Sequence, residues 1–245
     1  MGFWNKVQKW QKDRHPACTM IVAAAGSSAR MGGGDKLLMP LSGMPVLMHT
    51  LLAIDGAELV DEIVVATREE SLLEVADICS HAGIRKPVKI VKGGENRTAS
   101  VLAAAMECDP KTELIAVHDG ARPLILPQEI DALVAMGAKT YAVAPAVPVN
   151  DTIKVADENG LVKSTPDRNS LYAIQTPQVF QADILKAALQ AAWESGEAVT
   201  DDCAAVERIG KEVYLTAGNQ ENLKITTPFD LTMAELILRQ REGRL

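Results

Sequence analysis

The sequence predicts an α/β protein with an open, mostly parallel sheet, helices on both faces and an inserted β-hairpin. Short apolar runs alternate with helical patterns along the chain, and this alternation is typical of βαβ units. Hydrophobic residues make up 47% of the 245 residues but aromatic residues only 4%, so Ala, Val, Leu and Ile must fill the core. Such a composition favours buried parallel strands covered by Ala-rich helices. One segment, residues 148–170, departs from the alternation and predicts the hairpin.

Strands are predicted where apolar residues form short runs. The first run (MIVAAA) breaks into a turn of Gly and Ser residues, and the fourth (LIAVH) stops abruptly at an Asp-Gly pair. The predicted strands are residues 20–25, 62–67, 88–91, 114–118, 141–147 and 212–216. Ligands in open α/β sheets bind beyond the carboxyl ends of the strands, so we expect the site in the loops after the first, third and fourth strands.

Helices are predicted where apolar residues recur on one face or where alanine is abundant. Residues 69–82 have a mostly one-sided apolar face, residues 98–108 are rich in alanine, and Pro127 suits the first turn of a helix. The predicted helices are residues 69–82, 98–108, 127–136, 182–194 and 201–209, and a C-terminal helix that begins near Pro228. With the strands they form the βα succession that a sheet covered on both faces requires.

The hairpin signal is the sequence DENG at residues 157–160, which lies between two β-prone halves. A hairpin inserted into an α/β domain serves as a dimerisation arm or as a lid. We therefore predict one domain over residues 19–245, with an arm at about residues 148–170. An N-terminal extension, residues 1–18, precedes it and is either a loosely tied segment or a short amphipathic helix that contacts a membrane or a partner.

Charge and cysteine content exclude several classes of protein. A net charge of -7 argues against a nucleic-acid-binding surface, which normally carries a basic excess. The four cysteines are scattered and form no CxxC pair, so reduced thiols in a cytoplasmic protein are expected. No apolar run reaches the ~18 residues that a membrane span needs. The N-terminus also lacks the continuous apolar core of a secretory signal.

The loop after the first predicted strand reads VAAAGSSARMGGGDK over residues 22–36. It matches neither the Walker pattern nor the dinucleotide fingerprint, so a redox dehydrogenase is a remote alternative. Its small residues leave backbone N–H groups free to bind phosphate, and Arg30 and Lys36 add positive charge. A solvated loop without a ligand is the plain alternative for this segment taken alone.

Six further motifs follow this loop in order. They are GGENRTAS at 93–100, HDGARP at 118–123, NDTIK at 150–154, TPQ at 176–178, TDD at 200–202 and NLKITTP at 222–228. Together they resemble the 2-C-methyl-D-erythritol 4-phosphate cytidylyltransferases of the non-mevalonate isoprenoid pathway, from Thr19 to the C-terminus. The resemblance implies a Rossmann-like nucleotidyltransferase fold, CTP and a sugar-alcohol phosphate as substrates, a magnesium ion, and a homodimer joined through the hairpin arm.

The resemblance also implies roles for individual residues. The nucleotide-binding set lies in three of the motifs and comprises Ala23, Ala24, Ala25, Gly26, Gly94, Glu95, Ser100 and Gly120. The catalytic set is Arg30, Lys36 and Lys224, and Asp119 is the metal-associated carboxylate. The acceptor-binding set is Arg122, Thr152, Arg168, Thr176 and Lys224. If the arm is exchanged between subunits, Thr152 and Arg168 act in the site of the other subunit.

Three positions depart from the usual family pattern. Asp35 stands where many relatives have Pro or Asn, and the spacing from Arg30 to Lys36 is one residue shorter than in some relatives. Gly120 replaces a common Ala, and Glu95 stands where Asp is frequent. The first departure concerns the conformation of the loop rather than its charge.

The implied reaction is an in-line attack by a phosphate-monoester oxygen on the α-phosphorus of CTP. The attacking oxygen is already an anion at neutral pH, so no general base is required. The barrier lies in bringing two polyanions together and in stabilising charge on the phosphoryl oxygens, which cations do well. Accordingly, His118 is interpreted as a hydrogen-bonded core histidine, and Asp201 and Asp202 as a helix N-cap and a first-turn acid.

Several alternatives remain open from the sequence. Ribitol 5-phosphate is the competing acceptor, although NDTIK and the following TPDR are closer to the methylerythritol enzymes. A catalytically silent nucleotide-binding relative is a second alternative, since a fold alone does not prove activity. The retained charges of the motifs argue against it. Asp119 could also simply cap the turn that follows its strand.

Overall fold

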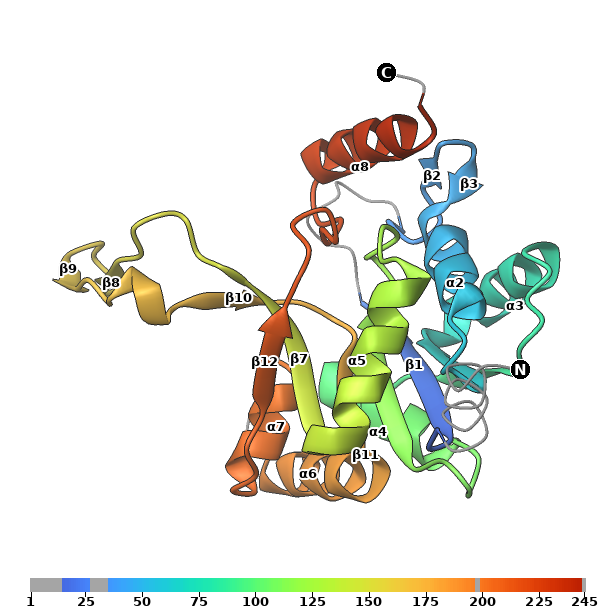
Figure 1. Ribbon diagram of the computed structural model, residues 1–245, viewed down its shortest axis with the longest axis horizontal. Coiled ribbons are helices and arrows are strands. Elements are labelled where there is room, and N and C mark those ends of the chain that lie inside the picture. The colour runs from blue at the N-terminus through green and yellow to red at the C-terminus, as the bar shows by residue number, and fades with distance from the viewer. Residues whose placement is uncertain (1–14, 27–34, 197–198, 244–245) are drawn as a thin grey trace, which may run out of the picture.

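The computed structural model describes residues 15–26, 35–196 and 199–243, and it contains an eight-stranded central sheet (Figure 1). The predicted extension falls almost entirely outside these residues. The strands of the sheet are β1 (Cys18–Ala24), β4 (Glu62–Thr67), β5 (Val88–Lys92), β6 (Leu114–Asp119), β7 (Ala142–Pro148), β10 (Tyr172–Ile174), β11 (Gln178–Gln181) and β12 (Tyr214–Ala217). Their order is β10-β7-β11-β6-β1-β4-β5, with β12 paired to β7.

The parallel pairs of this sheet are β1–β4, β1–β6, β4–β5 and β7–β12. Strand β11 is antiparallel to both β6 and β7, and β10 is antiparallel to β7. The predicted α/β class with a mostly parallel sheet is therefore confirmed. The chain passes from β1 to β4 and β5 on one side and returns to β6 on the other, so the order reverses at β1, where ligands bind in such sheets.

Helices cover both faces of the sheet. One face carries α2 (Val46–Gly56), α3 (Leu72–His81), α5 (Pro127–Thr140) and α8 (Pro228–Arg241), and the other carries α4 (Arg97–Met106), α6 (Ala182–Ser195) and α7 (Asp202–Arg208). Strand β1 shows the expected alternation, because Met20 and Val22 pack on the first face and Ile21 on the second. Both cores consist largely of aliphatic side chains, as the composition predicts.

The sequence patterns did not predict α2, β2 (Pro40–Leu41), β3 (Met44–Pro45), β10 or β11. Helix α2 is apolar around most of its circumference, so it shows little of the one-sided periodicity that marks a surface helix. Strand β11 has four residues, and the two-residue strands β2 and β3 form a small hairpin. Such short strands carry too few residues for a recognisable alternation.

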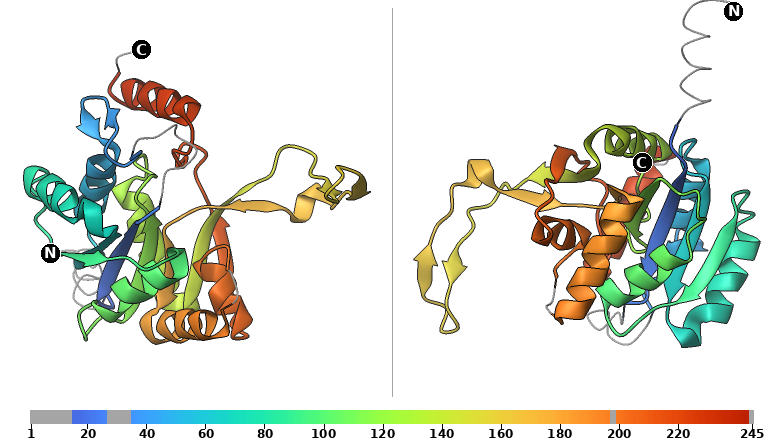
Figure 2. Two further views of the ribbon diagram at one scale, coloured as in Figure 1. Left: turned by 180° about the vertical axis from the view of Figure 1, so that it is seen from behind. Right: turned by 90° about the horizontal axis from the view of Figure 1, so that it is seen from below.

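The inserted hairpin projects from the sheet between β7 and β10 (Figures 1 and 2). Its tip pairs β8 (Val155–Ala156) with β9 (Val162–Ser164) in antiparallel register. The turn is the predicted DENG segment, in which Asp157 accepts hydrogen bonds from the amides of Asn159 and Leu161, each at 3.0 Å. Gly160 supplies the positive φ of 80° that the turn requires.

The cysteines and the hydrophobicity of the helices agree with the sequence patterns. All four cysteines are free, and three of them are buried. Over residues 15–26, 35–196 and 199–243, no helix has both the length and the apolar character needed to cross a bilayer.

Candidate active site

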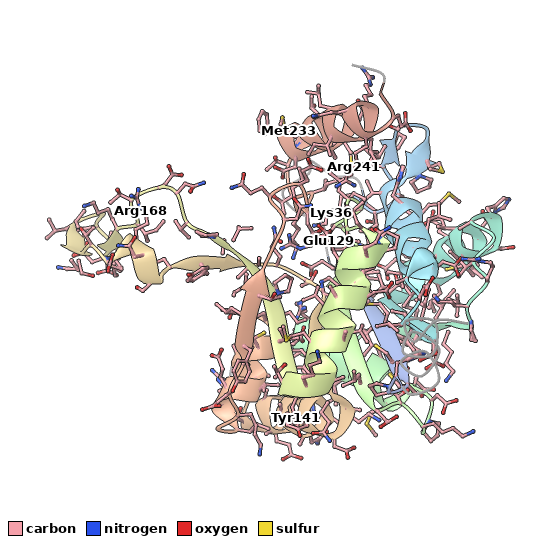
Figure 3. All side chains as sticks on the ribbon, viewed as in Figure 1. Lys36, Glu129, Tyr141, Arg168, Met233 and Arg241 are labelled. Atoms are coloured by element: carbon pink, nitrogen blue, oxygen red, sulfur yellow. The ribbon has the colours of Figure 1, made fainter. Side chains whose placement is uncertain are left out.

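A cavity of about 330 Å³ opens at the carboxyl ends of β1, β5 and β6. It brings together residues that are far apart in the sequence: Ala23, Ala25, Gly26, Lys36, Leu37, Gly94, Glu95, Asn96, Arg97, Ser100, Asp119, Ala121 and Lys224. Lys36, Asp119 and Lys224 therefore share one cavity. Figure 3 shows Lys36 in the body of the molecule, near the upper end of the sheet. Arg30 lies outside the described residues.

Asp119 is the last residue of β6 and lies at the centre of a group of cations. Its Oδ2 is 3.0 Å from Lys224 Nζ and 3.2 Å from Arg122 Nε, and its Oδ1 is 4.0 Å from Arg97 Nε. Burial opposes ionisation of this carboxyl, but the charges of Lys224, Arg97 and Arg122 outweigh it and hold its pKa well below the usual range. Asp119 is thus a fixed anion at the base of the cavity.

Lys224 reaches the cavity from an irregular segment before α8 that is pinned on both sides. Ile225 donates its amide to the carbonyl of Ala121 at 2.8 Å, and Asn222 Nδ2 donates to the carbonyl of Thr176 at 2.9 Å. Asn222 is buried, and its own carbonyl accepts from Arg122 at 2.7 Å. Asn222 lies in the NLKITTP motif, but no role was predicted for it.

The glycine turn at residues 93–94 forms the wall next to the start of α4. A Cβ on Gly94 would lie 2.4 Å from Ala99 Cβ, so only glycine fits this close approach. Ser100 Oγ donates to the carbonyl of Asn96 at 2.7 Å and accepts from the Gly94 amide at 3.1 Å. Asn96 caps α4 by accepting from the Ala99 amide at 2.9 Å. Gly94, Glu95 and Ser100 of the predicted nucleotide-binding set therefore belong to one hydrogen-bonded turn.

The remaining nucleotide-set residues flank the end of β1. Ala23, Ala25 and Gly26 line the cavity, whereas the side chain of Ala24 packs in the core. Gly120 donates its amide to the carbonyl of Ala23 at 3.0 Å. Gly120 itself does not line the cavity, but this bond connects the ends of β1 and β6 directly beneath it.

Arg97 lines the cavity, although no role was predicted for it. Its guanidinium makes a two-point contact with buried Asp202, with NH1–Oδ1 at 2.8 Å and NH2–Oδ2 at 2.7 Å. Pairing with Asp202 outweighs the effect of burial and raises the pKa of Arg97, which stays charged. Asp201 caps α7 by accepting from the Ala204 amide at 2.9 Å, as expected. The GGENRTAS motif contains Arg97, but a buried partner over 100 residues away is not visible in the sequence.

Arg122 and Thr176, two residues of the acceptor set, lie beneath the cavity rather than on its wall. Both are buried, and Thr176 Oγ1 accepts from the Asp119 amide at 3.0 Å. The same hydroxyl contacts His118 Nδ1 at 3.0 Å, and His118 Nε2 lies 3.2 Å from the Arg122 carbonyl. His118 is fully buried, and burial lowers its pKa to about 4. These contacts agree with the interpretation of His118 as a core histidine.

Two residues of the acceptor set, Thr152 and Arg168, lie on the arm. In the single chain they are far from this cavity. Arg168 is exposed and donates to the Asn150 carbonyl at 2.9 Å. Figure 3 shows it on the projecting arm, well separated from Lys36 in the body. Within one chain, the structure therefore does not bring the arm residues together with Lys36, Asp119 and Lys224.

The chain is similar to known proteins along most of its length. The family model described as 2-C-methyl-D-erythritol 4-phosphate cytidylyltransferase matches residues 18–240. A protein of that name from Pelotomaculum thermopropionicum is 43% identical over 228 residues, which are 92% of this chain and 95% of that protein. Another from Caldanaerobacter subterraneus subsp. tengcongensis is 43% identical over 222 residues, covering 90% of this chain and 98% of that protein.

Solved structures show the same relationship. The crystal structure of 4-diphosphocytidyl-2C-methyl-D-erythritol synthase from Anaerococcus prevotii superposes with a TM-score of 0.83 and 29% identity, covering 92% of this chain and all (100%) of that chain. The 2-C-methyl-D-erythritol 4-phosphate cytidylyltransferase of Thermus thermophilus gives a TM-score of 0.73 and 27% identity, covering 91% of this chain and 99% of that chain. The chain therefore belongs to the 2-C-methyl-D-erythritol 4-phosphate cytidylyltransferase family.

Proposed function

We propose that this protein transfers CMP from CTP to 2-C-methyl-D-erythritol 4-phosphate, giving 4-CDP-2-C-methyl-D-erythritol and pyrophosphate. The observation that carries the proposal is the cavity that Lys36, Asp119 and Lys224 share, in a chain that belongs to this family along nearly its full length. The curated relatives named above carry this activity in their names, which favours methylerythritol phosphate over ribitol 5-phosphate as the acceptor.

The glycine turn is suited to bind cytosine. Cytosine presents one exocyclic amine donor and two acceptors. The amides of Gly93 and Gly94 already donate to Thr67 and Ser100, so it is a carbonyl of this turn that can accept from the exocyclic amine. The Ser100–Gly94 hydrogen bond keeps this turn in one conformation. Uracil reverses part of the donor and acceptor pattern, and each buried mismatched polar group costs about 1–3 kcal/mol. The enzyme should therefore prefer CTP to UTP.

The cations of the cavity are suited to the two phosphates. Lys36 on the β1 side is proposed to bind the triphosphate, and Lys224 on the β6 side to bind the reacting phosphates. These charges reduce the repulsion between acceptor and donor and stabilise charge on the phosphoryl oxygens as the α-phosphorus–oxygen bond to pyrophosphate breaks. No base is needed, and His118, next to Asp119, is buried with both ring nitrogens in hydrogen bonds.

Magnesium is proposed as the metal ion of the reaction. Within the described part of the chain, no group of three or more His, Cys, Asp or Glu residues could hold a metal alone. This fits magnesium, which proteins commonly bind through one or two carboxylates together with substrate phosphates. Asp119 offers a carboxylate at the cavity, as does Glu95. When bound, the ion would neutralise phosphate charge, while Lys224 and Arg122 keep the Asp119 carboxylate ionised.

A homodimer with exchanged arms is proposed as the active form. Thr152 and Arg168 lie on the projecting arm, where they can contact the acceptor only in the cavity of another copy. The exposed apolar side chains of the arm and its base support an interface there: Ile153, Val155, Leu161, Val162, Tyr172 and Ile174. The four free cysteines support a cytoplasmic location.

A pyrophosphate-release assay tests this function. The purified protein should release pyrophosphate from CTP with methylerythritol phosphate and magnesium, and much more slowly with ribitol 5-phosphate or with UTP. Faster turnover with ribitol 5-phosphate would reassign the acceptor. No release with either acceptor would leave the catalytically silent alternative.

A further inference from the structure

Asp35, the residue directly before Lys36, is held by an ion pair with Arg68. Asp35 Oδ2 accepts from Arg68 NH2, and the side chain of Asp35 is only 12% exposed. Arg68 follows the last residue of β4, so the pair connects the loop before α2 to the carboxyl end of the neighbouring strand. Arg68 is itself oriented, because Ser71 Oγ lies 3.4 Å from the same NH2 and Glu70 lies 3.6 Å from its Nε.

The same carboxylate also shapes the backbone around Lys36. Asp35 Oδ1 accepts from the Leu37 amide at 3.0 Å, and the Asp35 carbonyl accepts from the Leu38 amide at 3.0 Å. Lys36 therefore lies between Asp35 and Leu37, two residues that hydrogen bonds hold in place. On its far side, the Leu37 carbonyl accepts from the Leu47 amide at 2.9 Å, which attaches the turn to the start of α2.

The ion pair lies beside the nucleotide cavity. Arg68 lines an adjoining hollow of about 380 Å³ that shares Ala25, Gly94 and Glu95 with the main cavity. A shift of Asp35 would therefore move Lys36 relative to the glycine turn. Small displacements of a group that positions substrate are costly to the rate.

We infer that the Asp35–Arg68 pair is a positioning device for Lys36, and that it sets where Lys36 meets the triphosphate. Neither residue needs to touch substrate, because both act through the backbone of the turn. The inference rests on the proposed function for its kinetic consequence. Its structural consequence, a turn held in place by the pair, is independent of that function.

Two single variants and their combination test the inference. Asp35→Asn removes the charge but retains an oxygen for the Leu37 amide, and Arg68→Met removes the pair from the other side. Each should lower kcat/KM for CTP about tenfold, with KM for the acceptor unchanged. The double variant should be no worse than either single variant, because the two residues form one unit.

Lys92→Met is the matched control. Lys92 also lines the adjoining hollow, at the end of the next strand, but its ion pair is with Glu69 and not with a residue of the turn around Lys36. This variant should retain the kinetic constants of the unmodified protein. Losses that simply add in the Asp35/Arg68 double variant, or an equal loss in Lys92→Met, would overturn the inference.

Hydrogen–deuterium exchange provides a readout that does not depend on activity. The amides of Leu37, Leu38, Met39 and Leu41 should exchange faster in Asp35→Asn and Arg68→Met than in the unmodified protein, while the amides of β4 stay protected. Thermal unfolding checks that each variant is folded. If the unmodified protein fails to use CTP, the proposed function is wrong, and the exchange rates still decide the inference. Unchanged exchange in both variants would overturn it.

Discussion

At the scale of single residues, the base of the cavity is a set of compensated charges. Asp119 lies between Lys224 and Arg122, and Asp202 is paired with Arg97. Charges at such depth are tolerated only when a partner and hydrogen bonds replace the lost water. The arrangement keeps fixed charges beneath the phosphates without leaving a buried charge uncompensated.

Removing one member of the Arg97–Asp202 pair should destabilise the fold strongly. Arg97→Met leaves Asp202 as a buried, unpaired carboxylate, and we expect a loss of about 3–5 kcal/mol in the free energy of unfolding. The double variant Arg97→Met/Asp202→Leu should recover most of that loss, because neither charge remains. Urea unfolding of the three proteins measures the effect. Equal stability of the single variant and the unmodified protein would show that the pair is not essential to the fold.

His118 should make stability depend on pH in the acidic range. Its pKa is about 4 in the folded protein against 6.5 for the reference side chain, so the unfolded state binds the proton more readily between these values. The contribution is fully present above about pH 6.5 and is lost as the pH falls toward 4, to a total of about 3 kcal/mol. In urea unfolding, the unmodified protein should lose more stability than His118→Gln over this range. Parallel pH curves for the two proteins would contradict the assignment.

At the scale of elements, the start of α4 is shaped by the glycine turn. Gly94 approaches Ala99 too closely for any side chain, and Asn96 and Ser100 complete the hydrogen bonds of the turn. Main-chain groups thus form this wall of the cavity, and the N-terminus of α4 fixes their positions. Its geometry depends on the packing of α4 rather than on one binding side chain.

Gly94→Ala should therefore impair nucleotide binding. The added methyl group would lie 2.4 Å from Ala99 Cβ and 3.0 Å from the Ala99 backbone, so the turn must move away from α4. We expect KM for CTP to rise about tenfold or more, consistent with the loss of one to two polar contacts to the base. Circular dichroism of Gly94→Ala should show an intact fold, which separates a shift of the turn from unfolding. An unaltered KM in Gly94→Ala would exclude the turn as the base-binding element.

Some of the strands and helices, and part of the site, could be predicted from the sequence. Strands with long apolar runs, such as β4 and β6, and the Ala-rich α4 appear within a residue or two of their predicted bounds, because burial on both faces leaves a strong local signal. Helix α2 and strand β11 were missed because their signals are uniform or short. In the site, motifs located Lys36, Asp119 and Lys224. Arg97 and Asn222 were missed because their importance comes from partners distant in the sequence.

At the scale of the whole molecule, the arm is difficult to explain in a monomer. It extends away from the domain (Figure 2), and most of its side chains are exposed, including several large apolar ones. Insertion of the arm against another copy would bury these side chains and bring Arg168 to a cavity that lacks it in the single chain. A closed, symmetric dimer is the simplest assembly in which both arms do so.

Mixed dimers test the exchange of arms. Lys36→Ala and Arg168→Ala proteins should each be nearly inactive, but mixing them with subunit exchange creates heterodimers in which one site has both residues. Random mixing should restore about one quarter of the unmodified activity, because about half the dimers are mixed and each has one intact site. No recovery, despite proven exchange by native mass spectrometry, would place Arg168 in the site of its own chain or outside any site.

The most direct test of the account is the turnover of Lys36→Ala with CTP at saturation, against Lys139→Ala, which removes an exposed lysine at the end of α5. If fixed cations at the sheet edge allow two phosphates to react, Lys36→Ala should lose about 10²–10³-fold in kcat, the scale of one preorganised charge contact. Lys139→Ala should keep full activity. Near-normal kcat in Lys36→Ala would contradict the account, because the transfer would then proceed without the charge on which it depends.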